Sequence, residues 1–116
     1  DVRYSMPYQV ERVALDFPKL QIIVAHGGFP WITEMIQVAY HCVNVHLLPD
    51  LFMLNMPGAG QYAEAANYIL KDQMLFGSAS PFAPLKESIQ CIDKLGLHED
   101  ARSRFFYENA ARLLKL

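Results

Sequence analysis

Three short apolar segments, each followed closely by residues that favour turns, constrain the fold of this sequence most strongly. They span residues 21–25, 43–48 and 73–76. The first and third carry consecutive apolar residues, a pattern typical of parallel strands that are covered on both faces. Glycine or proline stands within two residues of the end of each segment, as expected where a strand gives way to a loop. We therefore predict three buried strands.

Amphipathic helical patterns occupy the stretches between these segments. Apolar residues recur at helical spacing within residues 10–17, 31–39, 62–70 and 85–92, and residues 100–116 are predicted to form one or two closing helices. Strands separated by roughly 20 to 30 residues, with helices between them, indicate parallel strands joined by right-handed crossovers. The chain is therefore predicted to be an α/β protein.

This order of elements permits two architectures, a small open α/β sheet or an arc of a (β/α)8 barrel. A complete barrel needs about 250 residues, whereas the sequence has 116. Three parallel strands alone also leave two unpaired edges, which favour association. We therefore expect residues 1–116 to form a single partial domain that associates with itself or with the missing part of a barrel. The absence of an initial methionine fits this expectation.

Composition and charge narrow the possible partners. An apolar fraction of 53% excludes a disordered chain. Ten Lys and Arg residues against twelve Asp and Glu residues give a net charge of −2, so the basic excess of a nucleic-acid-binding protein is missing. No apolar run approaches the roughly 20 residues of a membrane-spanning helix. Cys42 and Cys91 lie in stretches of helical character, and we expect two buried, reduced thiols in a cytoplasmic protein.

The residues after the first predicted strand are the strongest candidates for a site, because chemistry in parallel α/β proteins gathers beyond the carboxyl ends of strands. His26 stands directly after this strand and precedes Gly27 and Gly28, which let the backbone turn sharply. Phe29 and Trp31 add aromatic surface nearby. We predict that the His26 imidazole points into a crevice, where a catalytic and a structural role both remain open.

The other two strand ends carry fewer reactive groups. Ser78 and Ser80 follow the third strand in a turn of small residues, where their hydroxyls either face the site or cap backbone N–H groups. The sequence there is not Gly-x-Ser-x-Gly, so it does not indicate a nucleophile elbow. Asp50 follows the second strand and is predicted to be an exposed turn residue.

The sequence holds no recognisable metal-binding motif. HxH, HExxH and Cys/His clusters are all missing from it, and three protein ligands for a metal are not evident. We interpret His41, at the end of a helix, and His46, within the second strand, as polar residues of the fold. His98 precedes Glu99 and Asp100 and is predicted to stand at the start of a helix.

Three motifs in order resemble the C-terminal part of the amidohydrolase-2 family. They are DFPKLQIIVAHGG at residues 16–28, MLFGSxSP at residues 74–81 and ENAARLL at residues 108–114. This branch of the amidohydrolase superfamily includes aminocarboxymuconate-semialdehyde decarboxylase and the resorcylate-type decarboxylases. The resemblance extends from about Met6 to the end of the sequence.

The resemblance implies a (β/α)8 TIM barrel, to which this sequence contributes about three C-terminal strand–helix units and the closing helices. It also implies a divalent metal, usually zinc, held by an HxH pair, a later histidine and an aspartate on the last strand. His26 matches the family's acid/base histidine. The aspartate position is Ala79 here, which cannot bind a cation, and Ser78 and Ser80 are poor substitutes. The HxH pair lies outside this sequence.

Two functions from different classes are compatible with these observations. The first is part of a metal-dependent hydrolase or decarboxylase that acts on a small carboxylate or aromatic acid. Its catalytic residue would be His26, and its substrate-binding residues Trp31, Ser78 and Ser80. The second is a non-catalytic, degenerate barrel or binding domain, which Ala79 supports. An open-sheet domain that only copies the turn chemistry is a third possibility.

Overall fold

Two parallel strands lie at the centre of the fold, β1 (Ile22–Ala25) and β2 (Val45–Leu48). The computed structural model describes every residue from 1 to 116. The strands pair in register, from Ile22 opposite Val45 to Ala25 opposite Leu48, so their carboxyl ends lie side by side. The prediction of parallel pairing between the first two strands is confirmed.

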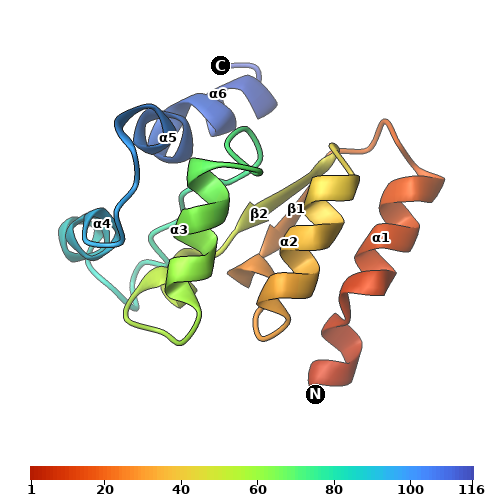
Figure 1. Cartoon of the computed structure of the whole chain (residues 1–116), viewed down its shortest axis with the longest axis horizontal. Helices are drawn as coiled ribbons and strands as arrows, with labels where there is room; N and C mark the ends of the chain where they lie inside the picture. The colour runs from red at the N-terminus through yellow and green to blue at the C-terminus, as the bar shows by residue number, and fades with distance from the viewer.

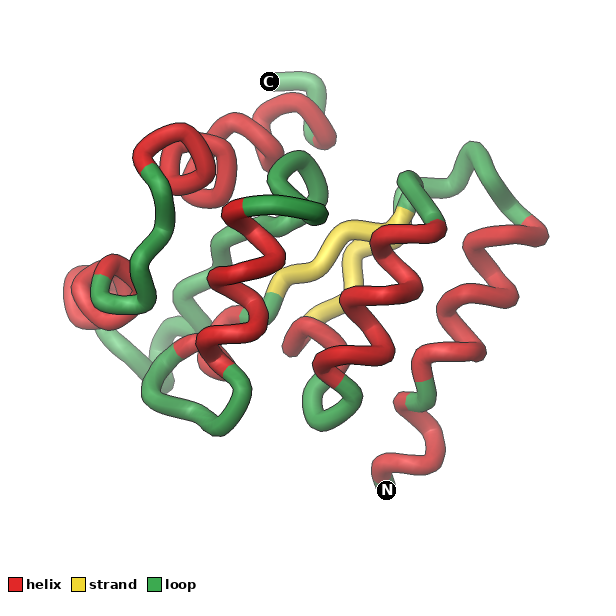
Figure 2. Tube along the Cα trace, in the orientation of Figure 1, coloured by secondary structure: helices red, strands yellow, loops and turns green.

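Helices connect the strands at the places that the apolar spacing predicts. They are α1 (Pro7–Asp16), α2 (Ile32–His41), α3 (Ala59–Asn67), α4 (Leu85–Asp93), α5 (Glu99–Ser103) and α6 (Asn109–Leu113). A π-helical turn joins α5 to α6, and short 3-10 turns follow both strands. Figure 1 shows α1, α2 and α3 side by side, with α2 in front of the strands. Figure 2 shows how small a part of the chain is strand.

The third predicted strand is reduced to a single parallel bridge to β2. Leu47 donates its N–H to the Gln73 carbonyl at 2.9 Å and accepts the Leu75 N–H at 2.8 Å. The next bond of such a ladder would need an N–H from Pro49, and proline has none. The prediction of a regular strand over residues 73–76 is therefore wrong in extent, although the segment lies where it was expected beside β2.

The two faces of β1 differ in burial. Ile22 and Val24 are half-buried against the helices, whereas Ile23 is 45% exposed and Ala25 is also exposed. The prediction that this strand is covered on both faces is therefore wrong within residues 1–116. The helices of this chain form a layer on one side of β1, and nothing in the chain covers the other.

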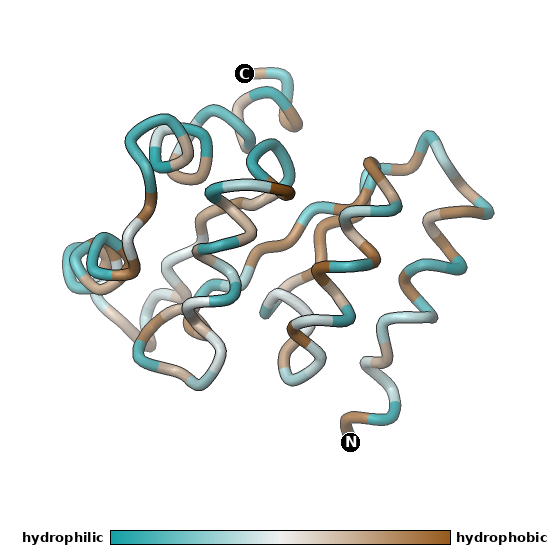
Figure 3. Tube along the Cα trace, in the orientation of Figure 1, coloured by the Kyte–Doolittle hydropathy of each residue, from teal (hydrophilic) through white to brown (hydrophobic).

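The hydrophobic core lies between the strands and the helices. Tyr62, Phe105 and Met35 are among its largest fully buried side chains, and burial of such apolar surface is the main source of stability. Figure 3 shows hydrophobic and hydrophilic residues alternating along α1 and α2, as in amphipathic helices. Both cysteines are free thiols, and the prediction that they are buried is confirmed for Cys42, whereas Cys91 is only half-buried.

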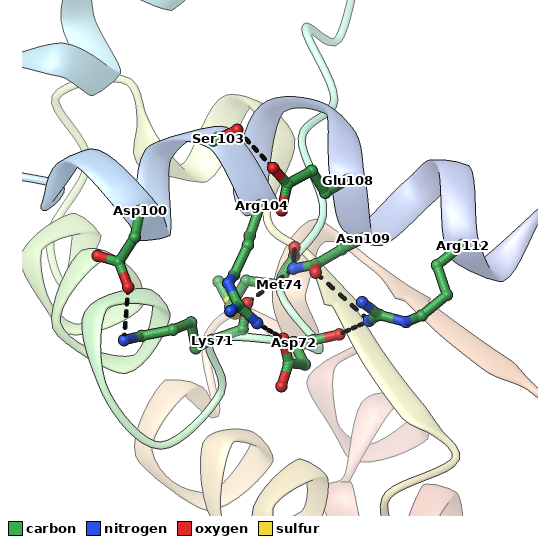
Figure 4. A network of polar contacts seen from close by, with 9 residues as sticks. All are labelled: Lys71, Asp72, Met74, Asp100, Ser103, Arg104, Glu108, Asn109 and Arg112. Carbon is green, nitrogen blue, oxygen red and sulfur yellow. Dashed lines mark hydrogen bonds and ion pairs between the residues drawn. The ribbon is translucent and has the colours of Figure 1, made fainter.

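Polar contacts of differing burial hold the closing helices against the loop before the third segment. Asn109, at the start of α6, is fully buried and donates to the carbonyls of Lys71 at 2.8 Å and Met74 at 2.9 Å. Arg112 donates to the Asp72 carbonyl at 2.6 Å. Figure 4 shows these side chains reaching from the closing helices to this loop. The helix and loop are thereby fixed relative to β2.

Candidate active site

The turn after β1 fixes the position of His26. His26, Gly27 and Gly28 all have positive φ angles, of 57°, 58° and 77°. A Cβ atom on Gly27 would lie 2.7 Å from the ring of Tyr62, and one on Gly28 would lie 2.6 Å from Met35. Neither position accepts a larger residue without displacement of the core. The His-Gly-Gly sequence therefore forms a tight turn that leaves His26 at the carboxyl end of β1.

His26 and Asp50 form the polar centre of this strand end. His26 Nδ1 lies 2.8 Å from Asp50 Oδ2 and 3.0 Å from Asp50 Oδ1. The register pairs Ala25 with Leu48, which brings together the residues just beyond both strands. The Asp50 side chain is only 9% exposed. The prediction of an exposed turn residue is therefore wrong, because the short helical turn after β2 directs the carboxylate toward His26.

The Asp50 carboxylate determines which nitrogen of the neutral His26 ring carries the proton. A carboxylate only accepts hydrogen bonds, so the proton lies on Nδ1 and is donated to Asp50. His26 Nε2 then carries the lone pair and has no hydrogen-bond partner in the chain, and the side chain is 58% exposed. One ring nitrogen is thus available to take or give a proton at an accessible surface.

Tyr62 supports the His26 turn from the core side. Its hydroxyl is fully buried and donates to the Gly27 carbonyl at 3.1 Å. Burial and the negative charge of Asp50 raise the pKa of the Tyr62 hydroxyl well above its usual value. The hydroxyl therefore remains a hydrogen-bond donor across the physiological pH range, which suits a residue that holds the loop.

Aromatic rings form one wall of the site. Phe52 meets the His26 ring edge-on, with centroids 5.3 Å apart, and stacks on Phe29 at 4.2 Å. Sequence reasoning missed Phe52, and its place four residues after the second strand end was the only available signal. Trp31 is half-buried, and its indole N–H donates to the Val2 carbonyl at 3.3 Å. Phe52, rather than Trp31, is thus the aromatic residue packed at the imidazole, and Phe29 stacks behind it.

The loop that holds Ser78, Ala79 and Ser80 passes beside the same strand ends. A Cβ atom on the preceding Gly77 would lie 2.6 Å from Leu48. The Ser80 N–H donates to Ser78 Oγ at 3.2 Å, as in the capping alternative. Neither hydroxyl forms a hydrogen bond with the His–Asp pair. Ala79 has a φ of 54° and brings no polar side-chain atom to the site.

The other histidines lie outside this strand end, in agreement with their interpretation as residues of the fold. His46 is buried in β2, and its Nε2 lies 2.9 Å from Gln21 Oε1. His41 ends α2 and contacts Gln37. His98 immediately precedes α5, as predicted.

The residues of this chain do not assemble a metal centre. Among residues 1–116, no group of three or more His, Cys, Asp or Glu side chains is placed to hold a metal ion. His26 and Asp50 offer two ligands at most, and His26 Nδ1 is already hydrogen-bonded to the Asp50 carboxylate. Ala79 supplies none. The donor set falls short of the three or four protein ligands of a zinc site.

Comparison with known families decides where this chain belongs. A family model described as amidohydrolase matches residues 1–116. The chain belongs to the amidohydrolase family. This family lies in a superfamily of metal-dependent hydrolases whose members usually bind divalent metals.

A TIM-barrel protein of known structure is similar to this amidohydrolase chain. It is the uncharacterised protein Bb4693 from Bordetella bronchiseptica, with 41% sequence identity and a TM-score of 0.94. The match covers 99% of this chain and 41% of the Bordetella chain. This likeness supports part of a barrel over a small open sheet. No curated protein matches the sequence. None of the helices has the length and apolar character to cross a membrane.

Proposed function

We propose that this chain is the C-terminal part of an amidohydrolase barrel in which His26 is the catalytic acid/base. The His26–Asp50 pair carries the proposal. It joins an accessible imidazole to a buried carboxylate at the carboxyl ends of two parallel strands, where barrel enzymes place their active sites. The proposed reaction is hydrolysis or decarboxylation of a small carboxylate or aromatic acid, as in the aminocarboxymuconate-semialdehyde decarboxylase branch that the motifs resemble.

The pair performs proton transfer in either reaction. In a decarboxylation, His26 acts in its imidazolium form: Nε2–H gives its proton to the carbon that keeps the electron pair of the breaking C–C bond, CO2 leaves, and solvent returns a proton to Nε2. In a hydrolysis, His26 Nε2 takes a proton from the water that attacks the scissile carbon, and gives this proton to the leaving group as its bond to that carbon breaks. Asp50 holds the ring in place and stabilises the imidazolium form. General acid–base catalysis of this kind accelerates a reaction by about 10²–10⁴-fold.

The surroundings of the imidazole support a planar acid as substrate. Phe29 and Phe52 are stacked at 4.2 Å and offer an apolar wall to a ring or a short unsaturated chain. In the proposal, the Ser78 and Ser80 hydroxyls donate hydrogen bonds to the substrate carboxylate, and Trp31 extends the aromatic wall. These three residues come from the two loops that follow β1 and the third segment.

Any divalent metal in this enzyme needs ligands from outside residues 1–116. Zinc is the metal that the resemblance implies, and Ala79 removes its expected aspartate ligand from this chain. The proton transfer described above is assigned to His26 and Asp50, whose hydrogen bond is formed within residues 1–116.

The uncovered face of β1 supports a protein partner. Ile23 is 45% exposed there, and the chain covers only 41% of the similar Bordetella barrel. We propose that the remaining part of a barrel, or failing that a second copy of this chain, covers this face. The free thiols Cys42 and Cys91 support a reducing, cytoplasmic compartment.

The experiment uses the protein expressed from its natural gene and a panel of small aliphatic and aromatic carboxylic acids. CO2 release and NMR of the products identify turnover. The His26→Gln variant is expected to lower kcat/KM by at least about 100-fold. His41→Gln is the matched control, because the His41 side chain is also 58% exposed and lies at the end of α2. Full activity in His26→Gln would exclude this acid/base. Failure of the wild-type protein to convert any acid would favour a non-catalytic barrel.

A further inference from the structure

A second polar site lies at the opposite ends of the strands from His26. It is a pocket of about 760 Å³. Gln21 and Val43, which precede β1 and β2, line it together with Gln73 before the third segment and residues of the closing helices. The amino ends of the parallel strands thus face this pocket, whereas the His26–Asp50 pair lies at their carboxyl ends. The proposed function makes no use of it.

Positive charge dominates the lining of this pocket. Arg104, Arg112 and Lys115 carry it, and Asp72 is the only acidic side chain among the lining residues. Asp72 is already engaged, because its carboxylate pairs with Arg104. The arrangement leaves an excess of cationic groups around an open space, which is unfavourable unless a counter-charge is present.

Two of these cations retain unused hydrogen-bonding capacity. The Arg112 guanidinium uses one nitrogen, which donates to the Asp72 carbonyl at 2.6 Å and to Asn109 Oδ1 at 3.3 Å. Its other N–H groups have no partner in the chain. Lys115 has no carboxylate within 4.0 Å, unlike Lys71, which pairs with Asp100 at 2.8 Å. Figure 4 shows the Arg112 and Arg104 side chains reaching toward Asp72.

His46 is an independent sign that the polar contacts of this pocket are incomplete. It lines the pocket, is only 6% exposed, and binds Gln21 through Nε2. Its other ring nitrogen, Nδ1, is buried and has no hydrogen-bond partner. Buried polar atoms are almost always paired in folded proteins. Because Nε2 donates to the Gln21 amide oxygen, Nδ1 of the neutral ring carries the lone pair, and the partner missing beside it is a hydrogen-bond donor rather than the anion itself.

We propose that this pocket binds one anionic oxygen group, a carboxylate or a phosphate, between Arg112 and Lys115. A guanidinium fork binds carboxylate and phosphate oxygens in pairs, and a lysine ammonium adds a second charge from the side. The group comes either from a free anion or from an acidic side chain of the barrel segments outside residues 1–116. Both sources share the same chemistry, and the experiment separates them.

The first arm measures thermal unfolding of the protein expressed from its natural gene while inorganic phosphate is added at constant ionic strength. Saturable stabilisation is expected if a free anion binds. Lys115→Gln should weaken the apparent phosphate affinity about fivefold or more, the loss of one charge-assisted contact. Lys86→Gln is the matched control, because Lys86 is an exposed lysine of α4 that does not line the pocket.

The second arm compares the same variants without phosphate, at low and at high salt. If a carboxylate of the protein occupies the pocket, Lys115→Gln lowers Tm more than Lys86→Gln at low salt, and high salt removes the difference. If the pocket is empty, Lys115→Gln raises Tm at low salt instead, because removal of an unpaired lysine beside arginines relieves repulsion. The proposal is overturned if Lys115→Gln changes neither the phosphate response nor the salt-dependent Tm beyond the control. A phosphate response equal in all variants also overturns it.

Discussion

His26 Nδ1 and the Asp50 carboxylate meet at 2.8 Å across the carboxyl ends of β1 and β2. The two partners differ in environment, because the Asp50 side chain is 9% exposed and that of His26 is 58% exposed. The buried partner fixes the ring, and the accessible partner presents Nε2 outward. A buried carboxylate that loses its only cationic or N–H partner is costly. A change in either residue is therefore expected to alter the other, and substitution of Asp50 tests the role of His26.

Asp50→Asn is expected to lower kcat about 100-fold with little change in KM. The amide keeps the size of the side chain but removes the charge that stabilises the imidazolium. ¹⁵N NMR of the His26 ring should show loss of the Nδ1–H form. Asp16→Asn, at the exposed end of α1, serves as the control. An unchanged ring spectrum would mean that Asp50 does not position His26.

The sequence predicts the position of His26 better than its partner. An apolar strand followed by His-Gly-Gly gives the turn, because the tight backbone there requires glycine at two positions. Asp50 looked like a turn residue, since a proline before an aspartate is a common turn pattern. Its burial depends on the register between β1 and β2 and on the turn that follows β2. The register involves β1, more than 20 residues away from Asp50 in the sequence, so the local turn pattern alone does not reveal the burial.

The third predicted strand shows a different failure: its own sequence favours a strand, but its length is limited by the neighbouring strand. Residues 73–76 have the apolar run of a buried strand, but strand length also depends on the partner strand. Pro49 lies where β2 would donate the next ladder bond, and it has no N–H to give. Proline in one strand therefore shortens its neighbour. The uncovered face of β1, by contrast, depends on what lies outside residues 1–116.

Gly27→Ala is expected to destabilise the protein by about 2–4 kcal/mol. A Cβ atom at this position would lie 2.7 Å from the Tyr62 ring, and the φ of 58° disfavours any L side chain. Gly60→Ala is the control, since Gly60 lies in α3 with nothing within 4 Å of the added atom. That change should stabilise the helix by about 0.5–1 kcal/mol. Urea unfolding measures both, and equal values for the two variants would contradict the described turn.

Asn109→Ala is expected to cost about 2–4 kcal/mol, because it removes the donor from one buried and one partly buried carbonyl. Asn109 is fully buried and bonds the carbonyls of Lys71 and Met74. Gln90→Ala, at an exposed position of α4, should change stability by less than about 0.5 kcal/mol. Hydrogen exchange of the Met74 region should accelerate only in Asn109→Ala. Unaltered exchange there would show that α6 is held by other contacts.

Stability is expected to fall as the pH drops below about 6.5, partly through His46. Burial, and secondarily the positive charge of Arg112, lower the pKa of His46 in the folded protein. The unfolded chain therefore takes up a proton on acidification before the folded chain does, and protons favour the unfolded state. The contribution of His46 to stability is complete above the pKa that His46 has in the unfolded chain. It is lost as the pH falls through the lower pKa that His46 has in the folded protein.

The His46→Gln variant tests this assignment through the slope of unfolding free energy against pH between 5 and 7.5. A smaller slope than in the wild-type protein is expected, whatever the absolute stability of the variant. His98→Gln, at an exposed position before α5, should leave the slope unchanged. The same slope in the wild type and both variants would place the acid sensitivity elsewhere.

Ala79→Asp is expected to raise the zinc affinity of the protein expressed from its natural gene. The family motif has an aspartate at this position, and a carboxylate there adds the ligand that residues 1–116 lack. The backbone accepts the change, because the φ of 54° at Ala79 is tolerated by aspartate better than by most residues. Metal analysis after dialysis and zinc titration calorimetry measure the effect, with Ala83→Asp in the same loop as the control. An increase of about tenfold or more, confined to Ala79→Asp, is expected for one added carboxylate ligand. Equal zinc affinity in both variants would show that this loop is not aligned with the metal-binding loop of the family.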